Sequence, residues 1–343
     1  MLLLKVNNRW IILYTFLFLI IASIFFLSGC SDKNESGTNR VRLNEVTRSV
    51  FYAPQYVAME LGYFKENSLD VKLTSADGSD RTMTALLSGQ ADIGLLGTSS
   101  VISVYSQGKE SYPMIFSQLT QRDGSFLMGR TSNFNWEDLK GKSVIAGRKG
   151  GVPEMTFEYI LKNKGFDLQR DVKLLNNIQF NLMSIAFSRG VGDYVCLFEP
   201  TATLFQKEKS FYILKPLGLE CEPISYTAYC ASQKYIEENP EVIQSFTNAI
   251  YRAQLWVQNH TAEEIAKIIL PYFVDTSLEL LIECVDNYIS SQVWCSNPRI
   301  EFSSFELMQE IMKEAGELEE KVNFDALVDN KFAENSISEV NFK

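Results

Sequence analysis

Three short stretches of this sequence have the residue types needed to hold a small polar ligand. They are GTSS (97–100), GRKGGVPE (147–154) and LFEP (197–200). Each follows an apolar run typical of a buried strand and opens a segment with the pattern of a helix. The first backbone amides of a helix have no partner within it, and the helix dipole favours negative charge there. We therefore expect hydrogen-bonding chemistry at these three junctions.

The first two junctions suit a close approach between the backbone and a ligand. Thr98 and Ser99 supply hydroxyls, although either residue would also serve as an ordinary helix cap. Gly150 and Gly151, followed by Val152, let the backbone approach a ligand, or form no more than a tight turn. Both alternatives stay open at each junction, because a capping residue can also contact a ligand.

The third junction adds a carboxylate. Glu199 follows a predicted strand and suits a ligand that donates hydrogen bonds, such as an amine or an aminopyrimidine, while it would repel nitrate or a sulfonate. The alternative is a carboxylate that caps a helix or joins two lobes. Tyr52, Phe180 and Tyr226 would supply flat walls for a ligand, and each of them taken alone could equally belong to the core.

The sequence argues against several kinds of catalytic or cofactor site. Its one histidine, His260, lies in WVQNHTAEE at a predicted helix end, so triads and histidine-rich metal sites are excluded. No CxxC motif occurs, which excludes zinc ribbons and thioredoxin-like motifs. GKS at 141–143 is no nucleotide-binding loop, because Trp136 stands where its first glycine is required. We therefore expect no catalytic residue, no metal and no cofactor.

The cysteines predict a fold that needs no disulfide framework. Cys30 stands apart near the N-terminus, and five more follow: Cys196, Cys221, Cys230, Cys284 and Cys295. Closeness along the chain makes 221 with 230, or 284 with 295, the candidate pairs if any disulfide forms. We favour buried free thiols for most of them, because a chain of this length can be stable without disulfides.

The N-terminus has the pattern of a bacterial lipoprotein signal. Lys5 and Arg9 precede the apolar run 10–27, and LSGC (27–30) resembles a lipobox, in which the chain is cut before a lipid-bearing cysteine. A single membrane-spanning helix is the alternative, since about 18 apolar residues can just span a bilayer. The polar segment after Cys30 favours cleavage at 1–29, lipidation of Cys30 and a flexible tether at 30–40. The protein would then be anchored on the outer face of the cell membrane.

Length and charge describe the remaining chain. About 310 residues usually form two lobes rather than one core. The full sequence carries a net charge of −10, which argues against nucleic acid as a partner. From residue 41 onwards, strand and helix patterns alternate in two successive rounds, and the last hundred residues carry helical apolar stripes. This order predicts two α/β units with mainly parallel sheets and a helical C-terminal region.

Several stretches resemble the solute-binding proteins of the nitrate, sulfonate, taurine and thiamine-pyrimidine class of ABC importers. They are YAPQYVAMELGYFKENSLDVKL with ALLSGQADIGLLG, then WEDLKGKSVIAG, GGVPEMTFEYILKNKG and GDYVCLFEP, in the family's order over roughly residues 45 to 290. The resemblance implies a two-lobed periplasmic-binding-protein fold with a ligand cleft between the lobes. Each lobe would be a mostly parallel mixed sheet flanked by helices, with the helical C-terminal region packed on lobe I.

The resemblance also implies two connections that cross between the lobes. We place them near 118–124 and 224–229, which divides the chain into lobe I (41–121 and 227–343) and lobe II (122–226). Gln118, Arg122 and Asp123 then lie at the hinge, where Arg122 would either clamp an anionic ligand or pair with Asp123. Gln118 and Asp123 join the ligand-binding candidates.

The favoured function is that of a monomeric, lipid-anchored binding protein that delivers a nutrient to ABC permease subunits and their ATPase. A nitrogen heterocycle such as a thiamine pyrimidine precursor is the favoured ligand, and a sulfonate or nitrate is the alternative. A sensory lipoprotein with the same fold is a further alternative. An enzyme of the thiamine-pyrimidine synthase kind is disfavoured, because those enzymes use a cysteine-rich motif and a histidine that this chain does not place suitably.

Overall fold

A computed structural model describes residues 38–109, 111–209 and 211–340. The predicted signal peptide, Cys30 and most of the predicted tether lie outside the described residues, so the lipid anchor stays a prediction. Within the described ranges, no helix combines the length and the apolar character needed to cross a membrane.

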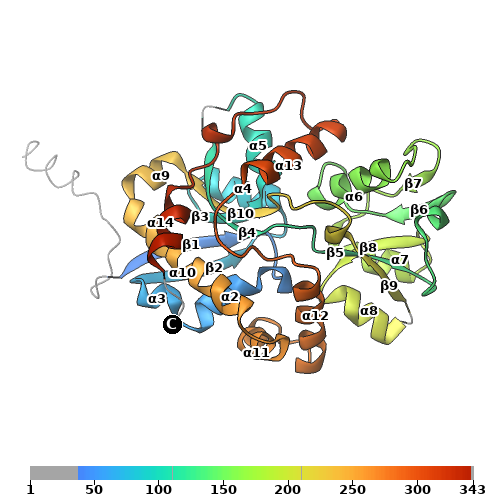
Figure 1. Cartoon of the computed structure of the whole chain (residues 1–343), viewed down its shortest axis with the longest axis horizontal. Helices are drawn as coiled ribbons and strands as arrows, with labels where there is room; N and C mark the ends of the chain where they lie inside the picture. Colours follow the sequence, from blue (N-terminus) through green and yellow to red (C-terminus); the bar gives the residue numbers. More distant parts are fainter. Residues whose placement is uncertain (1–37, 110, 210, 341–343) are drawn as a thin grey trace, which may run out of the picture.

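The protein is built on two five-stranded sheets, which lie side by side in Figure 1. Sheet A has the order β2 (Leu69–Ser75), β1 (Asn39–Glu45), β3 (Ile93–Gly97), β10 (Thr227–Ser232), β4 (Pro113–Thr120). Sheet B has the order β7 (Val172–Leu174), β6 (Lys142–Ile145), β8 (Tyr194–Phe198), β5 (Ser125–Gly129), β9 (Tyr212–Pro216). The mixed two-sheet α/β architecture that the sequence predicted is confirmed.

Each sheet contains one antiparallel strand. In each case it is the first strand that the chain forms after it crosses from the other sheet. β10 pairs antiparallel with β3 and β4, and β5 pairs antiparallel with β8 and β9, whereas β1, β2 and β3 are parallel, as are β6, β7 and β8. The chain passes from sheet A to sheet B through residues 121–124 and returns through residues 217–226. We call these segments the first and second crossing, and we propose 122 and 226 as the limits of lobe II.

Helices cover both sheets and form most of the C-terminal region. Those before the second crossing are α2 (Ala53–Glu60), α3 (Tyr63–Glu66), α4 (Ser79–Leu87), α5 (Thr98–Ser106), α6 (Val152–Asn163), α7 (Met183–Ser188) and α8 (Thr201–Lys209). Those after it are α9 (Gln233–Glu238), α10 (Pro240–Gln258), α11 (Ala262–Ile269), α12 (Leu278–Ser290), α13 (Phe302–Glu314) and α14 (Lys331–Glu339). Short 3-10 turns lie at 50–52, 136–139, 180–182, 217–219, 270–272 and 324–326.

Local residue chemistry sets many of these boundaries. Pro54 occupies the first turn of α2, where its missing amide hydrogen costs nothing. Gly62 ends the same helix with φ +77°, and Gly89 follows α4 with φ +71°, a left-handed backbone that glycine adopts without strain. The helices predicted for these stretches are confirmed.

Two local details differ from the sequence-based expectation. The strand β5 was not predicted, because SFLMG is too short to show a period-two pattern. The predicted capping role of Thr98 or Ser99 is wrong: Gly97 occupies the N-cap position of α5, and no side chain caps the helix. The hydroxyl of Thr98 instead bonds to the second crossing.

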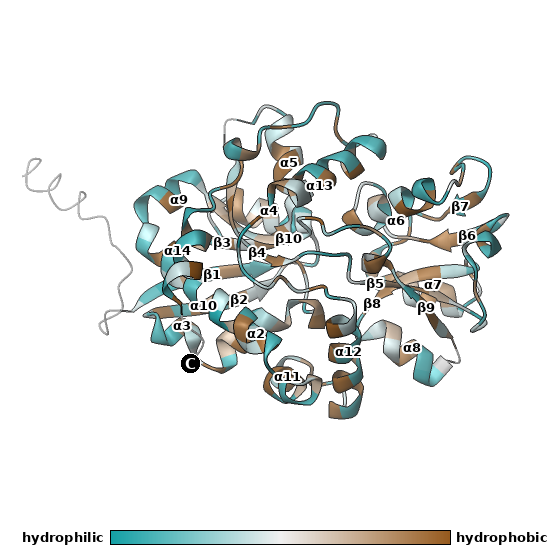
Figure 2. Ribbon diagram, viewed as in Figure 1, coloured by the Kyte–Doolittle hydropathy of each residue, from teal (hydrophilic) through white to brown (hydrophobic). Residues whose placement is uncertain are grey.

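One hydrophobic cluster runs from sheet A into sheet B. It includes Leu43 and Ile93 of sheet A and extends to Phe126, Val195 and Leu197 of sheet B. A second cluster, around Phe157 and Ile160 of α6, packs on the other face of sheet B. Figure 2 shows the hydrophobic residues concentrated in the strands, with hydrophilic residues on outer helices such as α9. The two lobes therefore meet in a closed arrangement.

Candidate functional site

The ends of the parallel strands in the two sheets face the junction between the lobes. Gly97, which ends β3, lies opposite Val152, which begins α6: a Cβ atom added at Gly97 would stand 3.4 Å from Val152 Cγ2. The N-termini of α5 and α6 therefore meet across the junction. Ligands of open α/β sheets bind at this edge, past the carboxyl ends of the strands. We call this region the interlobe junction.

Aromatic rings from both lobes fill the centre of the interlobe junction. The Phe51 ring lies 5.4 Å from the Tyr226 ring and 5.6 Å from the Phe198 ring, centroid to centroid. The Phe180 ring lies 5.7 Å from Phe198 and is half exposed, which places it at the rim. The Tyr52 ring is buried 5.7 Å from Phe51. Three predicted aromatic residues therefore lie around Phe51 and Phe198.

Sequence reasoning overlooked Phe51, the residue at the middle of this cluster. It stands next to Tyr52 in a 3-10 turn ahead of α2 and is 2% exposed. A Cβ atom at Gly124 would stand 2.5 Å from its ring, so the first crossing runs directly against it. An aromatic pair before a helix was the available signal, but the pattern does not distinguish a cleft wall from a core residue.

Asp123 is a buried carboxylate on the first crossing. It is 1% exposed and accepts hydrogen bonds from the Ser125 amide at 2.7 Å, from the Ser125 hydroxyl, and from the Tyr226 hydroxyl at 3.2 Å. Burial raises the pKa of Asp123 to about 6, and the hydrogen bonds from Ser125 and Tyr226 oppose that rise. A carboxylate with so raised a pKa beside aromatic rings is a candidate ligand contact.

The two crossings are tied together by polar side chains that were predicted as ligand contacts. Gln118 Nε2 donates to the carbonyls of Thr120 at 3.0 Å and Ile224 at 3.3 Å. The Thr98 hydroxyl donates to the Ser225 carbonyl and lies 3.1 Å from the Ser225 hydroxyl oxygen. Gln118 and Thr98 therefore fix the backbone of the crossings. Ser99, beside Thr98, is buried at the same helix start.

The glycine loop before α6 is held by a carboxylate of its own helix. Gly150 has φ +74°, and its amide donates to Glu154 Oε2 at 3.2 Å. Glu154 is fully buried, and its pKa is raised to about 7, mainly by burial and next by the charge of Glu158. Gly151 is the N-cap of α6. The amide of Gly150 is thus already paired with a carboxylate, which is unfavourable for a bound anion.

Glu199 has its oxygens occupied by residues of both lobes. Oε1 accepts from the Thr203 hydroxyl at 2.7 Å and from Asn287 Nδ2 at 2.7 Å, and Oε2 accepts from the Thr203 amide at 3.0 Å. Thr203 lies in α8 and Asn287 in α12. These contacts correspond to the capping and interlobe alternative for Glu199, while its role toward a ligand stays a prediction.

Arg122 forms no ion pair with Asp123 in the described residues, and its role as a clamp for an anionic ligand stays a prediction. Its Nη1 donates to the carbonyl of Gly218 at 2.8 Å and to that of Cys221 at 2.7 Å, so it holds the second crossing against the first. His260 lies at the end of α10, as expected, where its ring stacks on Trp256 at 3.8 Å between centroids. Both residues stabilise the fold.

All five described cysteines are free thiols. Cys196, Cys230, Cys284 and Cys295 are buried, and Cys221 is partly exposed. Neither candidate disulfide is formed. Burial raises the pKa of Cys221 to about 12, and the negative charge of Asp123 adds to the effect. These thiols have the environment of structural cysteines.

The buried charges are acidic. Among the described residues, Glu45, Asp123, Glu154, Glu158 and Glu199 are the buried charged side chains, and no lysine or arginine is buried. In the same ranges, no group of three or more His, Cys, Asp or Glu side chains could hold a metal ion. Of these carboxylates, Asp123 lies at the centre of the interlobe junction, and it suits a ligand that donates hydrogen bonds or carries positive charge.

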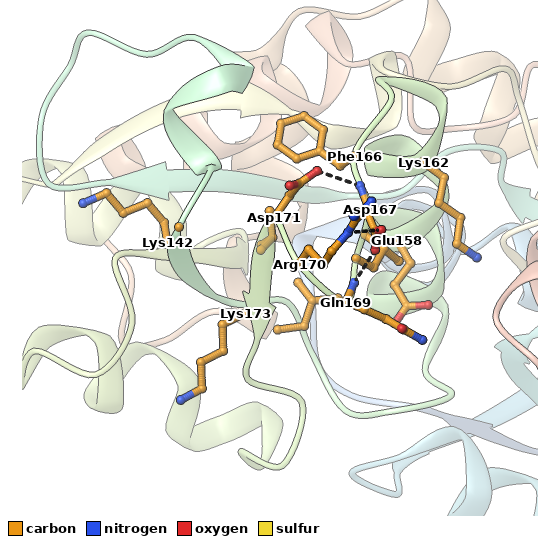
Figure 3. A pocket seen from close by; sticks show the side chains of 13 residues that line it. Lys142, Glu158, Lys162, Phe166, Asp167, Gln169, Arg170, Asp171 and Lys173 are labelled. Atoms are coloured by element: carbon orange, nitrogen blue, oxygen red, sulfur yellow. Dashed lines mark hydrogen bonds and ion pairs between the residues drawn. The ribbon is translucent and has the colours of Figure 1, made fainter.

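A separate hollow of about 910 Å³ lies on the outer surface of lobe II, between α6 and β7 (Figure 3). Its charged groups are engaged with one another: Arg170 Nε donates to Asp167 Oδ2 at 2.6 Å, and Asp171 Oδ2 accepts from the Asp167 amide at 2.8 Å. The side chains of Lys142 and Lys173 point away from these groups in Figure 3. We assign no ligand to this hollow.

Comparison with solved structures identifies the class to which this fold belongs. The alkanesulfonate-binding protein SsuA from Xanthomonas axonopodis pv. citri, bound to MOPS, superposes with a TM-score of 0.68 at 13% identity, covering 85% of this chain and 98% of that one. The fold is that of the periplasmic binding proteins.

Sequence comparison identifies the family. The family model described as NMT1/THI5 like matches residues 50–264. The chain is 40% identical over 337 residues to the Bacillus subtilis (strain 168) protein named "Putative binding protein YtlA", covering 97% of this chain and 99% of that one. It is 25% identical over 236 residues to a Candida albicans (strain WO-1) 4-amino-5-hydroxymethyl-2-methylpyrimidine phosphate synthase, covering 63% of this chain and 66% of that one. The chain belongs to the NMT1/THI5-like family.

Proposed function

We propose that this protein is an extracytoplasmic solute-binding lipoprotein of an ABC importer. It captures a small nutrient between its lobes and delivers it to permease subunits that are driven by an ATPase. The observation that carries the proposal is the interlobe junction, where rings from both lobes pack around Phe51 and the Tyr226 hydroxyl donates to the buried carboxylate of Asp123. A ligand that bridges the lobes would stabilise the closed form, which is the form a permease can distinguish from the empty protein.

The ligand class that we favour is a nitrogen heterocycle with an amino group, such as a thiamine pyrimidine precursor. Aromatic walls stack on a flat ring, and Asp123 accepts a hydrogen bond from its amino group. The acidic charge of the junction disfavours sulfonate or nitrate, which need positive charge or free amides. Tyr52, Ser99, Val152, Phe180 and Tyr226 complete the proposed contact surface.

The alternatives differ in what they require of the molecule. The structurally similar SsuA is an alkanesulfonate-binding protein, and a sulfonate-type anion would bind here at the helix N-termini of the junction. A sensory lipoprotein would use the same cleft with a signalling partner in place of the permease. A synthase activity, as named for the Candida relative, would need catalytic groups, and His260 stacks on Trp256 at the end of α10. We propose binding without catalysis.

Thermal unfolding of the full chain, purified in detergent, tests the ligand class. The probes are 4-amino-5-hydroxymethyl-2-methylpyrimidine, methanesulfonate and nitrate. A ligand present at about 100 times its dissociation constant adds about 2.7 kcal/mol to the free energy of unfolding. We expect this increase with the aminopyrimidine and none with either anion. Stabilisation by methanesulfonate alone would establish the alternative, and no stabilisation by any probe would reject the proposed ligand class.

The lipid anchor is tested separately. Cys30→Ser in the expressed full chain removes the predicted acyl acceptor. We expect the native chain to sediment with membranes after peripheral proteins are removed, because two or more acyl chains anchor a protein firmly. We expect the variant to incorporate no labelled fatty acid. Equal labelling of both chains would contradict lipidation at Cys30.

A further inference from the structure

Two pairs of helices connect the lobes beside the interlobe junction. α8 of lobe II packs against α12, and α6 of lobe II packs against α13, with α12 and α13 both belonging to the C-terminal region (Figure 1). We call these pairs the α12 contact and the α13 contact. Both have to be considered when the cleft opens, since a ligand can enter only if the lobes separate somewhere.

The α12 contact is buried and polar. Glu199 is 2% exposed and accepts from Asn287 at 2.7 Å, while its amide donates to the Tyr288 hydroxyl oxygen at 3.0 Å. The Tyr288 ring is fully buried and stacks on Phe126 of β5 with 5.9 Å between centroids. Separation of these helices would leave a desolvated carboxylate without one of its donors and would expose a tyrosine ring.

The α13 contact has exposed charged side chains at its rim, although Val152 and Met155 of α6 are buried in the same hydrophobic cluster as Ile311 of α13. Lys162 of α6 reaches the Glu314 carbonyl at 2.6 Å and its carboxylate at 3.9 Å, with both side chains about one third exposed. Glu317, just after α13, is exposed and faces Gly150, where a Cβ atom would stand 3.0 Å from its carboxylate. An exposed ion pair of this kind contributes little, because water screens it and long side chains lose rotamer freedom.

The two crossings lie closer to the α12 contact than to the far end of α13, which also favours opening at the α13 contact. The residues that follow α12 bond to the first crossing, where Gln121 donates from its backbone to Val293 O at 2.8 Å and from its side chain to Trp294 O at 3.1 Å. α13 begins at the second crossing, where Ser225 donates to Ser304 O at 3.1 Å. Glu314 lies ten residues further on, or about 15 Å along the helix. A rotation about the crossings therefore moves the α13 contact more than the α12 contact.

We propose that the cleft opens at the α13 contact while the α12 contact stays closed. Glu199, Asn287 and Tyr288 then act as a third hinge point beside the two crossings, and Asn287 is a positioning residue that keeps α8 against α12. This opening deepens the proposed function and rests on it, because it would let a ligand enter the cleft. The opening itself is a property of the protein without ligand.

Spin-label distances in the full chain without ligand test this inference. One sample carries labels at Lys162→Cys and Glu314→Cys, the other at Lys207→Cys and Glu283→Cys, in a background with Cys30→Ser and Cys221→Ser. Each double substitution removes one ion pair across one contact, so the two samples are perturbed alike. We expect a second, longer distance population for the α13 pair and a single narrow one for the α12 pair. Two narrow distributions, or a longer population at the α12 pair, would overturn the proposal.

Asn287→Ala tests the part assigned to α12. In the Lys207/Glu283 label background, we expect this variant to add a longer population, because Glu199 loses its donor from lobe I. Asp286→Ala, an exposed neighbour on the same helix, is the matched control and should leave the distances unchanged. An unchanged distribution in Asn287→Ala would reject the third hinge point. If the aminopyrimidine fails to remove the longer α13 population, that outcome counts against the proposed ligand class and leaves the ligand-free result intact.

Discussion

The Tyr226 hydroxyl donates a hydrogen bond to Asp123 Oδ2 at 3.2 Å, and this bond joins the two crossings at the centre of the interlobe junction. The Tyr226 ring also meets the Phe51 ring edge to face. The proposed ligand contact Asp123 is thereby directly connected to both segments that join the two sheets. The consequences can be measured in both stability and binding.

The free energy of unfolding should depend on the protonation of Asp123. Its pKa is about 6 in the folded protein, above the ordinary 3.8, so the stabilisation is complete below pH 3.8 and is lost as the pH rises through 6. The two-unit rise corresponds to about 3 kcal/mol. We expect Asp123→Asn to remove the decrease in unfolding free energy between pH 4 and 7, measured by chemical denaturation. The exposed control Asp275→Asn should retain that decrease. An unaltered pH profile in Asp123→Asn would refute the assignment.

Tyr226→Phe should change the protonation of Asp123 while keeping the ring. The lost hydroxyl is a donor that lowers the pKa of Asp123, so the pKa should rise further and the fall in stability should shift to higher pH. The measurement is the same pH series of unfolding free energies. A shift to lower pH would show that the hydroxyl does not donate to the carboxylate.

Glu199→Gln distinguishes the two roles of Glu199. From the sequence, we predict strong loss of affinity for an amino ligand. From the contacts with Thr203 and Asn287, we also predict a loss of about 1–3 kcal/mol in unfolding free energy without ligand, because the new amide places donors against donors. Glu208→Gln, exposed on the same helix, is the control. Unchanged stability together with lost binding would assign Glu199 to the ligand alone.

Gly218→Ala should disturb the close approach of the two crossings. A Cβ atom there would overlap the Asp123 carbonyl oxygen and stand 2.9 Å from Arg122 Cβ, so the backbone has to shift. We expect a loss of about 1–3 kcal/mol in unfolding free energy, measured by chemical denaturation. Gly97→Ala, whose Cβ would make an ordinary contact with Val152, should cost less. An equal cost for both variants would mean that the approach of the crossings does not matter.

The cysteines should be unreactive in the folded protein. Burial raises the pKa of Cys221 to about 12 and raises those of the other four as well, so few thiolates form at pH 8. In a Cys30→Ser background, we expect a thiol reagent to modify the native protein slowly and to titrate all five cysteines after denaturation without reductant. A titration of only three would reveal a disulfide.

Much of the architecture could be predicted because local rules specify it. The apolar strand runs, Pro54 in the first turn of α2 and the glycines 62 and 89 after their helices follow from backbone preferences within a few residues. The antiparallel strand β5 was not predicted, because its position depends on pairing with β8 and β9, which lie far away along the chain. The order of elements was therefore more predictable than the pairing of short strands.

The chemistry of the junction depends on longer distances. The sequence by itself determined which polar and aromatic residues follow the strands, how helices begin there, and the acidic character of the chain. Only the tertiary structure decided that Tyr226 bonds to Asp123, that Asn287 bonds to Glu199 and that Phe51 lies between both lobes. The physical reason is that helix ends and turns are local, whereas burial and the partner of a carboxylate are set when distant segments pack together.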